Sequence, residues 1–381
     1  MQFGLTPRPA VAHHMRLPHG RDPMIITQTP LRISFLGGGT DYPEYFSAHG
    51  GAVLGSAVDK SCYFTAAPFQ SRMFDYRLRV AYRKVECVAH INEIEHTPFR
   101  ECLRWTGLTR DAEITLTTEL PAMTGLGSSS AFTVGLLNTV YAHQKRPVPP
   151  LELANLAIEF ERNVLKESVG CQDQVFAAVG GFNLIEFPKR GAFVVHRVAI
   201  APDRLHELES HLICFFTGIR RRAEDLARAQ TRRIGLNLSR LAQMRALVDD
   251  GYRVLTGSGS LMPFGELLAR SWQLKRDLDA GVSNSRIDRW YRDGIDAGAV
   301  GGKLLGAGGG GFLMFFAAPE THGFIRASLA DLTEVNFSLN APGSRVIFAN
   351  TREQPQLPQH APASQRRGAY APHSPKKLEV A

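Results

Sequence analysis

The chain has 381 residues, of which 44% are hydrophobic and 21% are charged, and its formal net charge at pH 7 is +8. This composition is typical of a soluble globular protein, and the length predicts two domains. Much of the positive charge lies in the tails, because residues 1–23 carry three arginines against one aspartate and residues 354–381 carry four basic residues against one glutamate. The core is not basic enough to predict a nucleic-acid surface, and we expect no such partner.

The sequence contains no membrane or secretion signal. No run of about 18 apolar residues could span a bilayer, and the first 23 residues lack the apolar segment of a secretory signal. The five cysteines are scattered, odd in number and never arranged as C-x-x-C. Such a pattern is typical of free thiols in a reducing compartment. We therefore expect a cytoplasmic protein with no membrane partner, disulfide framework or zinc site.

Hydrophobic patterning predicts many strands in the first half of the chain and mostly helices in the second. Residues 1–23 and 353–381 show no periodicity, so disorder is expected there. The predicted elements in chain order are a strand-rich segment at 24–46 broken by three glycines, strands near 51–69, 77–88 and 112–120, helices from Ser128 and over 151–168, strands near 180–187, 192–200 and 211–218, a helical region at 220–279, and glycines before a buried strand ending at Phe316. This order predicts an α+β fold with domains at 24–200 and 201–352.

The stretch PAMTGLGSSSA, which starts at Pro121, lies between a predicted strand and a predicted helix. A glycine-rich turn into a helix N-terminus presents free backbone N–H groups and the positive end of the helix dipole to one point, which favours a bound anion. Glycine also permits a close backbone approach that a Cβ would block. These residues alone are compatible with a phosphate loop and with an ordinary serine N-cap. The stretch is not a Walker A loop, because no G-K-[ST] follows.

Two carboxylates downstream of this loop are candidates for phosphoryl-transfer chemistry. Such transfer needs oxygen ligands for Mg²⁺ and a carboxylate near the attacking hydroxyl. Glu161 lies near the end of the predicted helix, and Asp173 lies in the turn after Gly170, within the segment GCQDQ. The alternatives are a solvated surface glutamate and a helix N-cap aspartate.

Three segments in fixed order resemble the signature motifs of the GHMP small-molecule kinases. They are TPLRISFLGGGTDYPEYF, PAMTGLGSSSA and GGKLLGAGGGGFLMFF, and GCQDQ resembles the aspartate turn of the same superfamily. The resemblance runs from about Met24 to Arg352. It implies an N-terminal domain similar to domain 2 of ribosomal protein S5, a ferredoxin-like C-terminal domain, and an active site in the cleft between them.

Within the superfamily, longer segments resemble the D-glycero-D-manno-heptose 7-phosphate kinases. Two of them are GGGTDYPEYFSAHGGAVLGSAVDK and SNSRIDRWYRDGIDAGAVGGKLLGAGGGGF. That branch implies transfer of the ATP γ-phosphoryl group to the anomeric hydroxyl, which gives the 1,7-bisphosphate on the route to GDP-heptose. Leu304 and Leu305 stand where many members carry Thr or Ser, a departure that the heptose branch shares. A kinase for another sugar, such as a hexose or fucose, or for another small alcohol is the alternative within the superfamily.

The resemblance implies ATP and Mg²⁺ and assigns the residues that bind them. The expected nucleotide ligands are Pro121, Gly125, Leu126, Gly127, Ser128, Ser129, Ser130, Gly306, Gly308 and Gly309. Ser129 and Glu161 match the metal ligands. The glycines of the third motif also suit a tight turn before a core strand.

The resemblance also assigns the catalytic residues. Asp173 matches the catalytic aspartate, which would accept or orient the proton of the sugar hydroxyl. Arg32 would pair with Asp173 and stabilise negative charge on the transferring group, because a guanidinium keeps its charge. A buried structural ion pair is the alternative for Arg32.

The segment GGGTDY is expected to bind the sugar. Asp41 would hydrogen-bond sugar hydroxyls, supported by Gly38, Gly39 and Thr40, and an Asx-turn is the alternative for Asp41.

A heptose 7-phosphate also needs a group that binds its distal phosphate, most naturally an arginine. Arg220, Arg221 and Lys303 are the candidates, and a solvated basic face is the alternative. The expected partners are a sugar phosphate and ATP, and the chain is expected to be a monomer or a homodimer. A non-catalytic regulator that binds sugar and nucleotide is the alternative from another class, although the retained acidic, serine and arginine residues favour catalysis.

Overall fold

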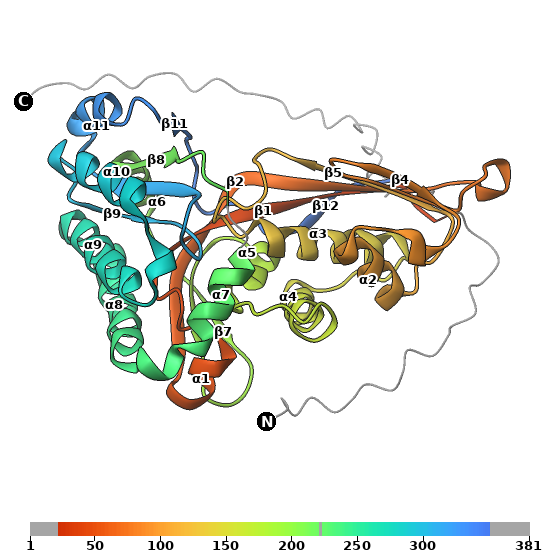
Figure 1. Cartoon of the computed structure of the whole chain (residues 1–381), viewed down its shortest axis with the longest axis horizontal. Coiled ribbons are helices and arrows are strands. Elements are labelled where there is room, and N and C mark those ends of the chain that lie inside the picture. Colours follow the sequence, from red (N-terminus) through yellow and green to blue (C-terminus); the bar gives the residue numbers. More distant parts are fainter. Residues whose placement is uncertain (1–21, 221–222, 351–381) are drawn as a thin grey trace, which may run out of the picture. The chain divides into compact units, whose positions relative to one another are not determined.

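Two antiparallel-rich sheets and the helices packed on them make up the protein, whose computed structural model describes residues 22–220 and 223–350 (Figure 1). The segments expected to be disordered lie outside the described residues, apart from residues 22 and 23, and so does Arg221. The described residues from Asp22 to Ala349 belong to one compact unit.

The first sheet has eight strands and is built around one long hairpin of strands β1 and β2. Its strands are β1 (Ile25–Leu36), β2 (Gly51–Pro68), β3 (Leu78–Ala81), β4 (Val85–Val88), β5 (Ala112–Thr118), β6 (Phe182–Phe187), β7 (Val194–Arg197) and β12 (Arg345–Ala349). The main order is β12-β1-β2-β5-β3-β4, with β6 beside β2 and β7 beside β6. The first part of β2 pairs with β6 and its last part pairs with β5. This division lets one long strand serve two neighbours on the same edge.

Strand β1 is a central strand, and its burial pattern shows this. Ile25 to Gln28 alternate between buried and partly exposed, whereas every residue from Thr29 to Leu36 is buried. Both faces of the strand are therefore covered from that point on. The register with β2 shifts between Pro30 and Arg32, and such an irregularity bends a strand and redirects a side chain. The buried, charged Arg32 follows this shift.

Helices α3 (Ser128–His143) and α5 (Gln172–Val179) pack on β1 and β2. A Cβ on Gly135 would lie 2.9 Å from the ring of Phe64, so only glycine lets α3 approach the sheet this closely. Around these helices lie α2 (Thr97–Thr106), α4 (Pro150–Glu159) and a π-helical turn at Phe160–Val164. Helix α1 (Pro43–His49) packs instead on the end of β6, where Phe46 stacks on Phe187. Together they bury the apolar side of the first sheet.

The second sheet has four strands in the order β11-β8-β10-β9, and every pairing is antiparallel. These strands are β8 (Leu212–Phe216), β9 (Gly301–Leu304), β10 (Phe312–Phe316) and β11 (Thr333–Glu334). The helices of this half are α6 (Pro202–His211), α7 (Ala223–Arg232), α8 (Leu238–Thr256), α9 (Met262–Arg276), α10 (Ser285–Asp296) and α11 (His322–Ser328). A second apolar core that includes Trp272 and Phe315 forms here. Among the described residues, no helix is long and apolar enough to cross a membrane.

The α+β class is confirmed, and α3 begins at Ser128 as predicted. The helix predicted over 151–168 is shorter, because α4 gives way to the π-helical turn that ends at Val164. The last strand, β12, pairs with β1 in the first sheet. The C-terminal segment thus returns to the N-terminal sheet, and the division into domains at 24–200 and 201–352 stays a prediction.

Candidate active site

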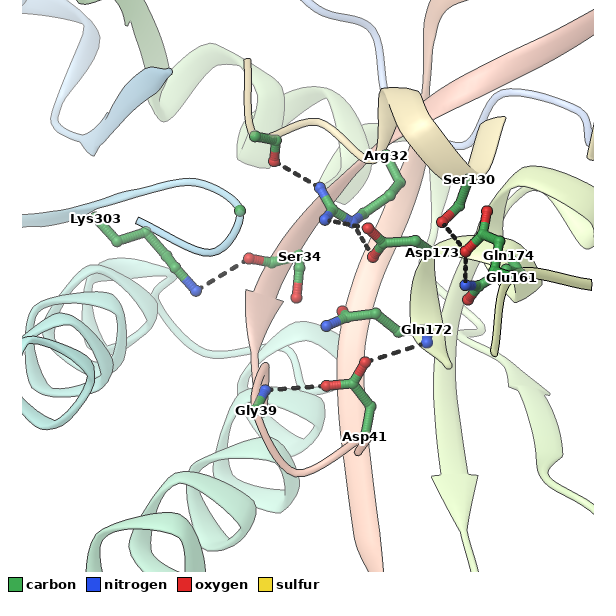
Figure 2. A network of polar contacts seen from close by, with 12 residues as sticks. Arg32, Ser34, Gly39, Asp41, Ser130, Glu161, Gln172, Asp173, Gln174 and Lys303 are labelled. Atoms are coloured by element: carbon green, nitrogen blue, oxygen red, sulfur yellow. Dashed lines mark hydrogen bonds and ion pairs between the residues drawn. The ribbon is translucent and has the colours of Figure 1, made fainter. Parts of the chain in front are cut away.

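An ion pair between Arg32 and Asp173 lies at the centre of the site (Figure 2). The guanidinium donates from Nε to Oδ1 and from Nη2 to Oδ2, both at 2.8 Å, and from Nη1 to the carbonyl oxygen of Gly125 at 2.8 Å. The Arg32 side chain is 6% exposed and that of Asp173 is 26% exposed. The predicted contact is present, and the carboxylate remains open to a ligand. Asp173 lies inside the first turn of α5, after its N-cap residue Cys171, so the alternative of an N-cap aspartate is wrong.

The glycine-rich loop meets this ion pair from the other side. The N-cap of α3 is Gly127, with φ +72° and no side-chain cap, so the alternative of a serine N-cap is also wrong. A Cβ on Gly127 would lie 3.1 Å from Cγ of Arg32 and 3.3 Å from Oδ2 of Asp173. The open end of α3, with its free N–H groups and positive dipole end, therefore lies directly beside the ion pair, as an anion site requires.

Two further residues of the loop have structural contacts. Leu126 is fully buried, and its carbonyl oxygen accepts from the backbone N–H of Arg32 at 3.0 Å. The carbonyl oxygen of Pro121 accepts from the hydroxyl of Thr124 at 3.2 Å. The first bond holds the loop against β1 and the second lies within the loop, and a role of either residue in nucleotide binding stays a prediction.

Glu161 lies in the π-helical turn and is fully buried. Its Oε2 atom accepts from the hydroxyl of Ser130 at 2.9 Å and from the side-chain amide of Gln174. Its Oε1 atom has no hydrogen-bond partner among the described residues. Burial raises the pKa of the carboxyl to about 7. The alternative of a solvated surface glutamate is therefore wrong.

The surroundings of Glu161 fit a hard cation, although no group of three or more His, Cys, Asp or Glu side chains suited to a metal occurs in the described part of the chain. A carboxylate and serine hydroxyls are the oxygen donors that Mg²⁺ prefers, with phosphate oxygens and water completing its shell. An unpartnered buried carboxylate oxygen with a raised pKa is a group that a cation would stabilise. The serine in contact with Glu161 is Ser130, whereas the predicted ligand Ser129 is exposed in the first turn of α3.

Asp41 lies at the end of the glycine turn that follows β1 and is 1% exposed. Its Oδ1 atom accepts from the N–H of Gly39 at 3.0 Å, and its Oδ2 atom accepts from the N–H of Gln172 at 3.2 Å. Burial and then the charge of Asp173 raise the pKa of this carboxyl, against the lowering effect of the two N–H groups. An Asx-turn would take its donor from two residues after Asp41, where Pro43 has no N–H, so the alternative of an Asx-turn is wrong. The carboxyl instead connects the glycine turn to the start of α5.

The polar side chains near Asp41 differ in whether their hydrogen bonds are already formed within the protein. The hydroxyl of Thr40 is fully buried and donates to the carbonyl oxygens of Gly37 and Ala52 at 2.8 and 2.9 Å, so it serves the turn itself. In contrast, the Oγ atom of Ser34 and the Oε1 atom of Gln172 are buried with no hydrogen-bond partner among the described residues. Figure 2 shows these two side chains reaching toward one space from β1 and α5, and a Cβ on Gly38 would lie 3.5 Å from each.

The glycines of the third motif form a loop between β9 and β10, and this third-motif loop contacts the glycine-rich loop at residues 121–127, the predicted phosphate loop. A Cβ on Gly306, where φ is +74°, would lie 2.4 Å from Cα of Gly125. A Cβ on Gly308 would lie 2.8 Å from the backbone of Val282. The N–H of Gly309 donates to the carbonyl oxygen of Val282 at 2.8 Å, so this predicted phosphate donor is engaged inside the protein. The glycines of the third motif thus both form a tight turn before β10 and let this loop approach the backbone of the glycine-rich loop before α3.

The basic residues predicted to bind the distal phosphate of the sugar do not point to one common site. Lys303 is 3% exposed, and its ammonium donates to the carbonyl oxygens of Ser34 and Phe35 at 3.0 and 2.6 Å. Arg220 is exposed in the segment after β8. A small pocket beside Asp41 is lined by Gly39, Tyr42, Gln230, Thr231, Ile234, Asn237, Leu241 and Leu278. None of these described residues is a lysine or an arginine.

A wider surface hollow of about 490 Å³ lies apart from this site, between the end of β4 and the end of α2. It is lined by residues that include Arg77, His90 and Arg110. None of its lining residues belongs to the three motifs, so size alone does not mark the candidate site.

Sequence reasoning missed Ser34, Gln172, Gln174 and Lys275. Gln172 and Gln174 flank the predicted aspartate, so alternate positions of a helix start could have drawn attention to them. Ser34 lies two residues after Arg32 on the same strand, and strand periodicity places both side chains on one face. Lys275 is 7% exposed on α9, and the sequence around it gives no signal of burial.

Two segments of the chain match models of one protein family. Residues 87–181 match "GHMP kinases N terminal domain" and residues 252–329 match "GHMP kinases C terminal". The chain is 30% identical over 305 residues to the D-glycero-alpha-D-manno-heptose 7-phosphate kinase of Campylobacter jejuni, an alignment that covers 77% of this chain and 90% of that protein. It is also 27% identical to the galactokinase of a Roseiflexus species, over 77% of this chain and 83% of the relative.

Solved structures share the fold. A D-glycero-D-manno-heptose 1-phosphate kinase from Bacteroides thetaiotaomicron superposes with a TM-score of 0.69 at 24% identity, covering 84% of this chain and 98% of that one. At this identity the likeness concerns the fold alone.

Proposed function

Because the chain belongs to the GHMP kinase family, whose sugar kinases are ATP-dependent phosphotransferases, we propose that it phosphorylates the anomeric hydroxyl of D-glycero-D-manno-heptose 7-phosphate. The product would be the 1,7-bisphosphate, a precursor of a nucleotide-activated heptose. The observation that carries the kinase chemistry is the bidentate Arg32–Asp173 pair at the open N-terminus of α3.

The choice of acceptor rests on the C. jejuni relative, which is named as a heptose 7-phosphate kinase and aligns over 90% of its length. The chemistry of the site is compatible with any sugar hydroxyl, so attack at C1 and a place in GDP-heptose synthesis belong to the proposal. A cytoplasmic location also belongs to it, because a kinase that uses ATP needs a compartment that supplies it.

In the proposed reaction, Asp173 accepts or orients the proton of the attacking hydroxyl. The sugar oxygen forms a bond to the γ-phosphorus of ATP, the bond from that phosphorus to the bridging oxygen of ADP breaks, and the hydroxyl proton passes to the carboxylate. Arg32 donates to both carboxylate oxygens, which fixes the direction of the Asp173 side chain. The loose transition state makes this a positioning role as much as a basic one.

The phosphates of ATP would bind at the N-terminus of α3. The backbone from Gly125 to Ser130 supplies N–H groups and the positive dipole end there, and Gly127 leaves room beside the ion pair. Glu161 would hold Mg²⁺ together with Ser129 or Ser130, since their oxygens suit this cation. When bound, the metal would offset negative charge on the β- and γ-phosphates.

The sugar would bind between the glycine turn and the start of α5. Asp41 is already oriented by two backbone N–H groups, and Ser34 and Gln172 offer buried polar atoms that lack partners among the described residues. Such atoms cost free energy until a ligand satisfies them. We expect them to bind ring hydroxyls, while the buried hydroxyl of Thr40 keeps its bonds within the turn.

A free hexose is the second candidate acceptor, and one observation favours it. Lys303 is buried against two carbonyl oxygens, and the residues described around the pocket beside Asp41 include no lysine or arginine. A neutral pocket suits hydroxyl groups better than a phosphate dianion. The distal phosphate of a heptose 7-phosphate would then depend on Arg220, which is exposed, or on Arg221, which lies outside the described residues.

The test is a coupled ADP-release assay with MgATP and a panel of acceptors. The panel contains D-glycero-D-manno-heptose 7-phosphate, mannose 6-phosphate, mannose, fucose and galactose, and Asp173→Asn is the control for catalysis. We expect turnover on the heptose phosphate and a loss of at least about 100-fold in kcat for the variant.

The other outcomes are distinct. Turnover on a free hexose alone would keep the kinase and reject the heptose phosphate as acceptor. No turnover on any sugar, with nucleotide still bound, would favour a non-catalytic regulator instead.

A further inference from the structure

Lys275 on α9 and Lys303 on β9 are buried beside the candidate site, with exposed fractions of 7% and 3%. Neither forms an ion pair within 4 Å among the described residues, and each donates only to backbone carbonyl oxygens. Burying an ammonium without a carboxylate is costly in a domain core. Two such groups next to a predicted phosphate site therefore require an explanation beyond packing.

The carbonyl groups bound by the two lysines belong to different parts of the site. Lys303 binds Ser34 and Phe35, which lie on β1. Lys275 binds the carbonyl oxygen of Gly306 and, at 3.4 Å, that of Leu304. Lys275 thus contacts the third-motif loop directly, whereas Lys303 contacts the strand that carries Arg32.

The contact of Lys275 continues into the catalytic pair through two backbones. Gly306 lies against Gly125, since a Cβ on Gly306 would be 2.4 Å from Cα of Gly125. The carbonyl oxygen of Gly125 in turn accepts from Nη1 of Arg32 at 2.8 Å. Lys275 therefore lies at one end of a continuous set of contacts that ends at the Arg32–Asp173 pair.

The charges that face this region do not balance. Lys275 is near enough to Arg32, Asp41 and Asp173 for each of them to alter its pKa, and Lys303 is influenced by Lys275 and Arg32. The region thus holds three basic side chains and two carboxyl groups. Burial lowers the pKa of Lys303 well below its ordinary value and raises that of Asp41, which leaves Lys275 and Arg32 as the cations of the region. An enclosed excess of positive charge is suited to an anionic ligand.

We propose that Lys275 is a positioning residue for nucleotide binding. Its ammonium holds the carbonyl of Gly306, so that the third-motif loop stays against the phosphate loop. Its charge adds to that of Arg32 in attracting the phosphates. The ammonium has three N–H groups and two carbonyl acceptors, so its charge is not neutralised by its contacts. This role rests on the proposed kinase function, because the anion is the polyphosphate of ATP.

The variant Lys275→Met, which removes both the donor and the charge, tests the role. Isothermal titration calorimetry with a non-hydrolysable MgATP analogue is applied to the full chain. We expect the dissociation constant to rise by at least about tenfold, because one charge is lost from a low-dielectric site. Lys275→Arg should restore most of the affinity. Arg276→Met is the matched control, since it removes a cation from the next position on α9 where the side chain is exposed and paired with Asp288; its affinity should stay within about twofold.

A second variant separates the hydrogen bond from the charge. Lys275→Gln keeps an N–H donor for the loop but carries no charge. It should therefore weaken nucleotide binding, and the change of nucleotide affinity with pH near 8 should disappear. In wild type, affinity should fall as pH rises through about 8, where Lys275 loses its proton. Asp41, Asp173, Arg32 and Lys303 face Lys275 and keep their side chains in the variant. Because the charge of Lys275 lowers the pKa of Lys303, the pH response that disappears is that of Lys275 together with its effect on Lys303.

The outcomes distinguish the two proposals. Wild-type protein that binds no nucleotide would reject the kinase function. Wild-type binding together with unchanged affinity and an unchanged pH response in both Lys275→Met and Lys275→Gln would reject only the role of Lys275. Thermal unfolding of each variant, run alongside, shows that any lost affinity belongs to a folded chain.

Discussion

At the scale of single residues, the orientation of the Asp41 carboxylate depends on Gly170, because glycine has no Cβ to collide with it. A Cβ on Gly170 would lie 2.1 Å from Oδ2 of Asp41. The same oxygen accepts from the N–H of Gln172, two residues later. Only glycine at this position lets the segment before α5 close around the carboxylate.

Gly170→Ala should therefore displace Asp41 and weaken sugar binding. We expect KM for the sugar to rise by at least about tenfold, because a buried carboxylate would lose its orientation, while the affinity for nucleotide stays close to that of wild type. Steady-state kinetics with the sugar varied at saturating MgATP measure the effect. Gly259→Ala is the control, since nothing lies within 4 Å of a Cβ there. Equal KM values for the two variants would contradict the assigned role of Asp41.

Lys275 also gives the protein a pH-dependent stability. Burial lowers the pKa of its ammonium from the ordinary value of 10.5 to about 8. Below pH 8 both the folded and the unfolded chain carry the charge, and its full cost to folding is present. Between pH 8 and 10.5 the folded chain has lost the proton and the unfolded chain retains it, so stability rises with pH. The shift corresponds to about 3 kcal/mol.

The free energy of unfolding of wild type relative to Lys275→Met should thus increase between pH 7.5 and 10.5 by an amount of that order. Urea denaturation of both proteins at several pH values measures it, and taking the difference removes the contribution of titrating groups that do not interact with Lys275. A difference that stays constant over this range would mean that Lys275 titrates at its ordinary pKa.

At the scale of elements, the phosphate loop and the third-motif loop are fitted to each other by glycine. Gly125 and Gly306 have φ of +83° and +74°, and a Cβ on either would meet the backbone of the other loop. A side chain at either position would therefore push the two loops apart. Glycine is required at both positions for two reasons, the positive φ and the lack of space for a Cβ.

Gly306→Ala should lower the affinity for a MgATP analogue by at least about tenfold, because the third-motif loop would move away from the phosphate loop. Gly107→Ala is a matched control, since Gly107 has φ of +76° and nothing within 4 Å of a Cβ. Both variants carry the cost of a left-handed alanine, about 1 kcal/mol. Only Gly306→Ala should lose affinity in calorimetry, and similar affinities for the two would show that contact between the loops is unimportant.

The elements that could be predicted are those with a strong local pattern. A β-rich run of residues predicted β1, alternating apolar residues predicted β2, and the glycine-rich turn predicted the start of α3 at Ser128. The π-helical turn around Glu161 has no such pattern, because its bond from Leu165 to the carbonyl of Phe160 adds one residue to an ordinary helical turn. This extra residue changes which side chain faces inward. Likewise, Ser130 meets Glu161 in place of Ser129 because of where α3 begins and how it is rotated.

Burial of charge was the least predictable part of the site. Lys275 follows polar and apolar residues at helical spacing, as an exposed lysine would. Its burial depends on the packing of α9 against β9 and on the loop that follows, which are set by tertiary structure. The pairing of Arg32 with Asp173 could be predicted only through the resemblance, since 141 positions separate the two residues.

At the scale of the whole molecule, the last described strand is joined to the first. Strand β12 pairs with β1, and the N–H of Ser344 donates to the carbonyl oxygen of Ala177 at 2.8 Å. The hydroxyl of Ser344 also lies 2.8 Å from Oγ1 of Thr29 and accepts from Nδ2 of Asn138 at 2.8 Å. The segment that follows the second sheet is thereby tied to β1, α3 and α5.

This connection predicts that the two sheets unfold together rather than as independent domains. Ser344→Ala removes the side-chain bonds to Thr29 and Asn138 and should destabilise the chain by about 1–2 kcal/mol, in a single transition seen by both tryptophan fluorescence and circular dichroism. Ser328→Ala is the control, because its hydroxyl bonds only to carbonyl oxygens near the surface of the second half, and it should shift stability by less. Two separate transitions, with only the first-sheet signal moved by Ser344→Ala, would instead support independent domains divided near residue 200. Because β1 carries Arg32, the single-transition outcome would also mean that the Arg32–Asp173 ion pair is lost only when the whole unit unfolds.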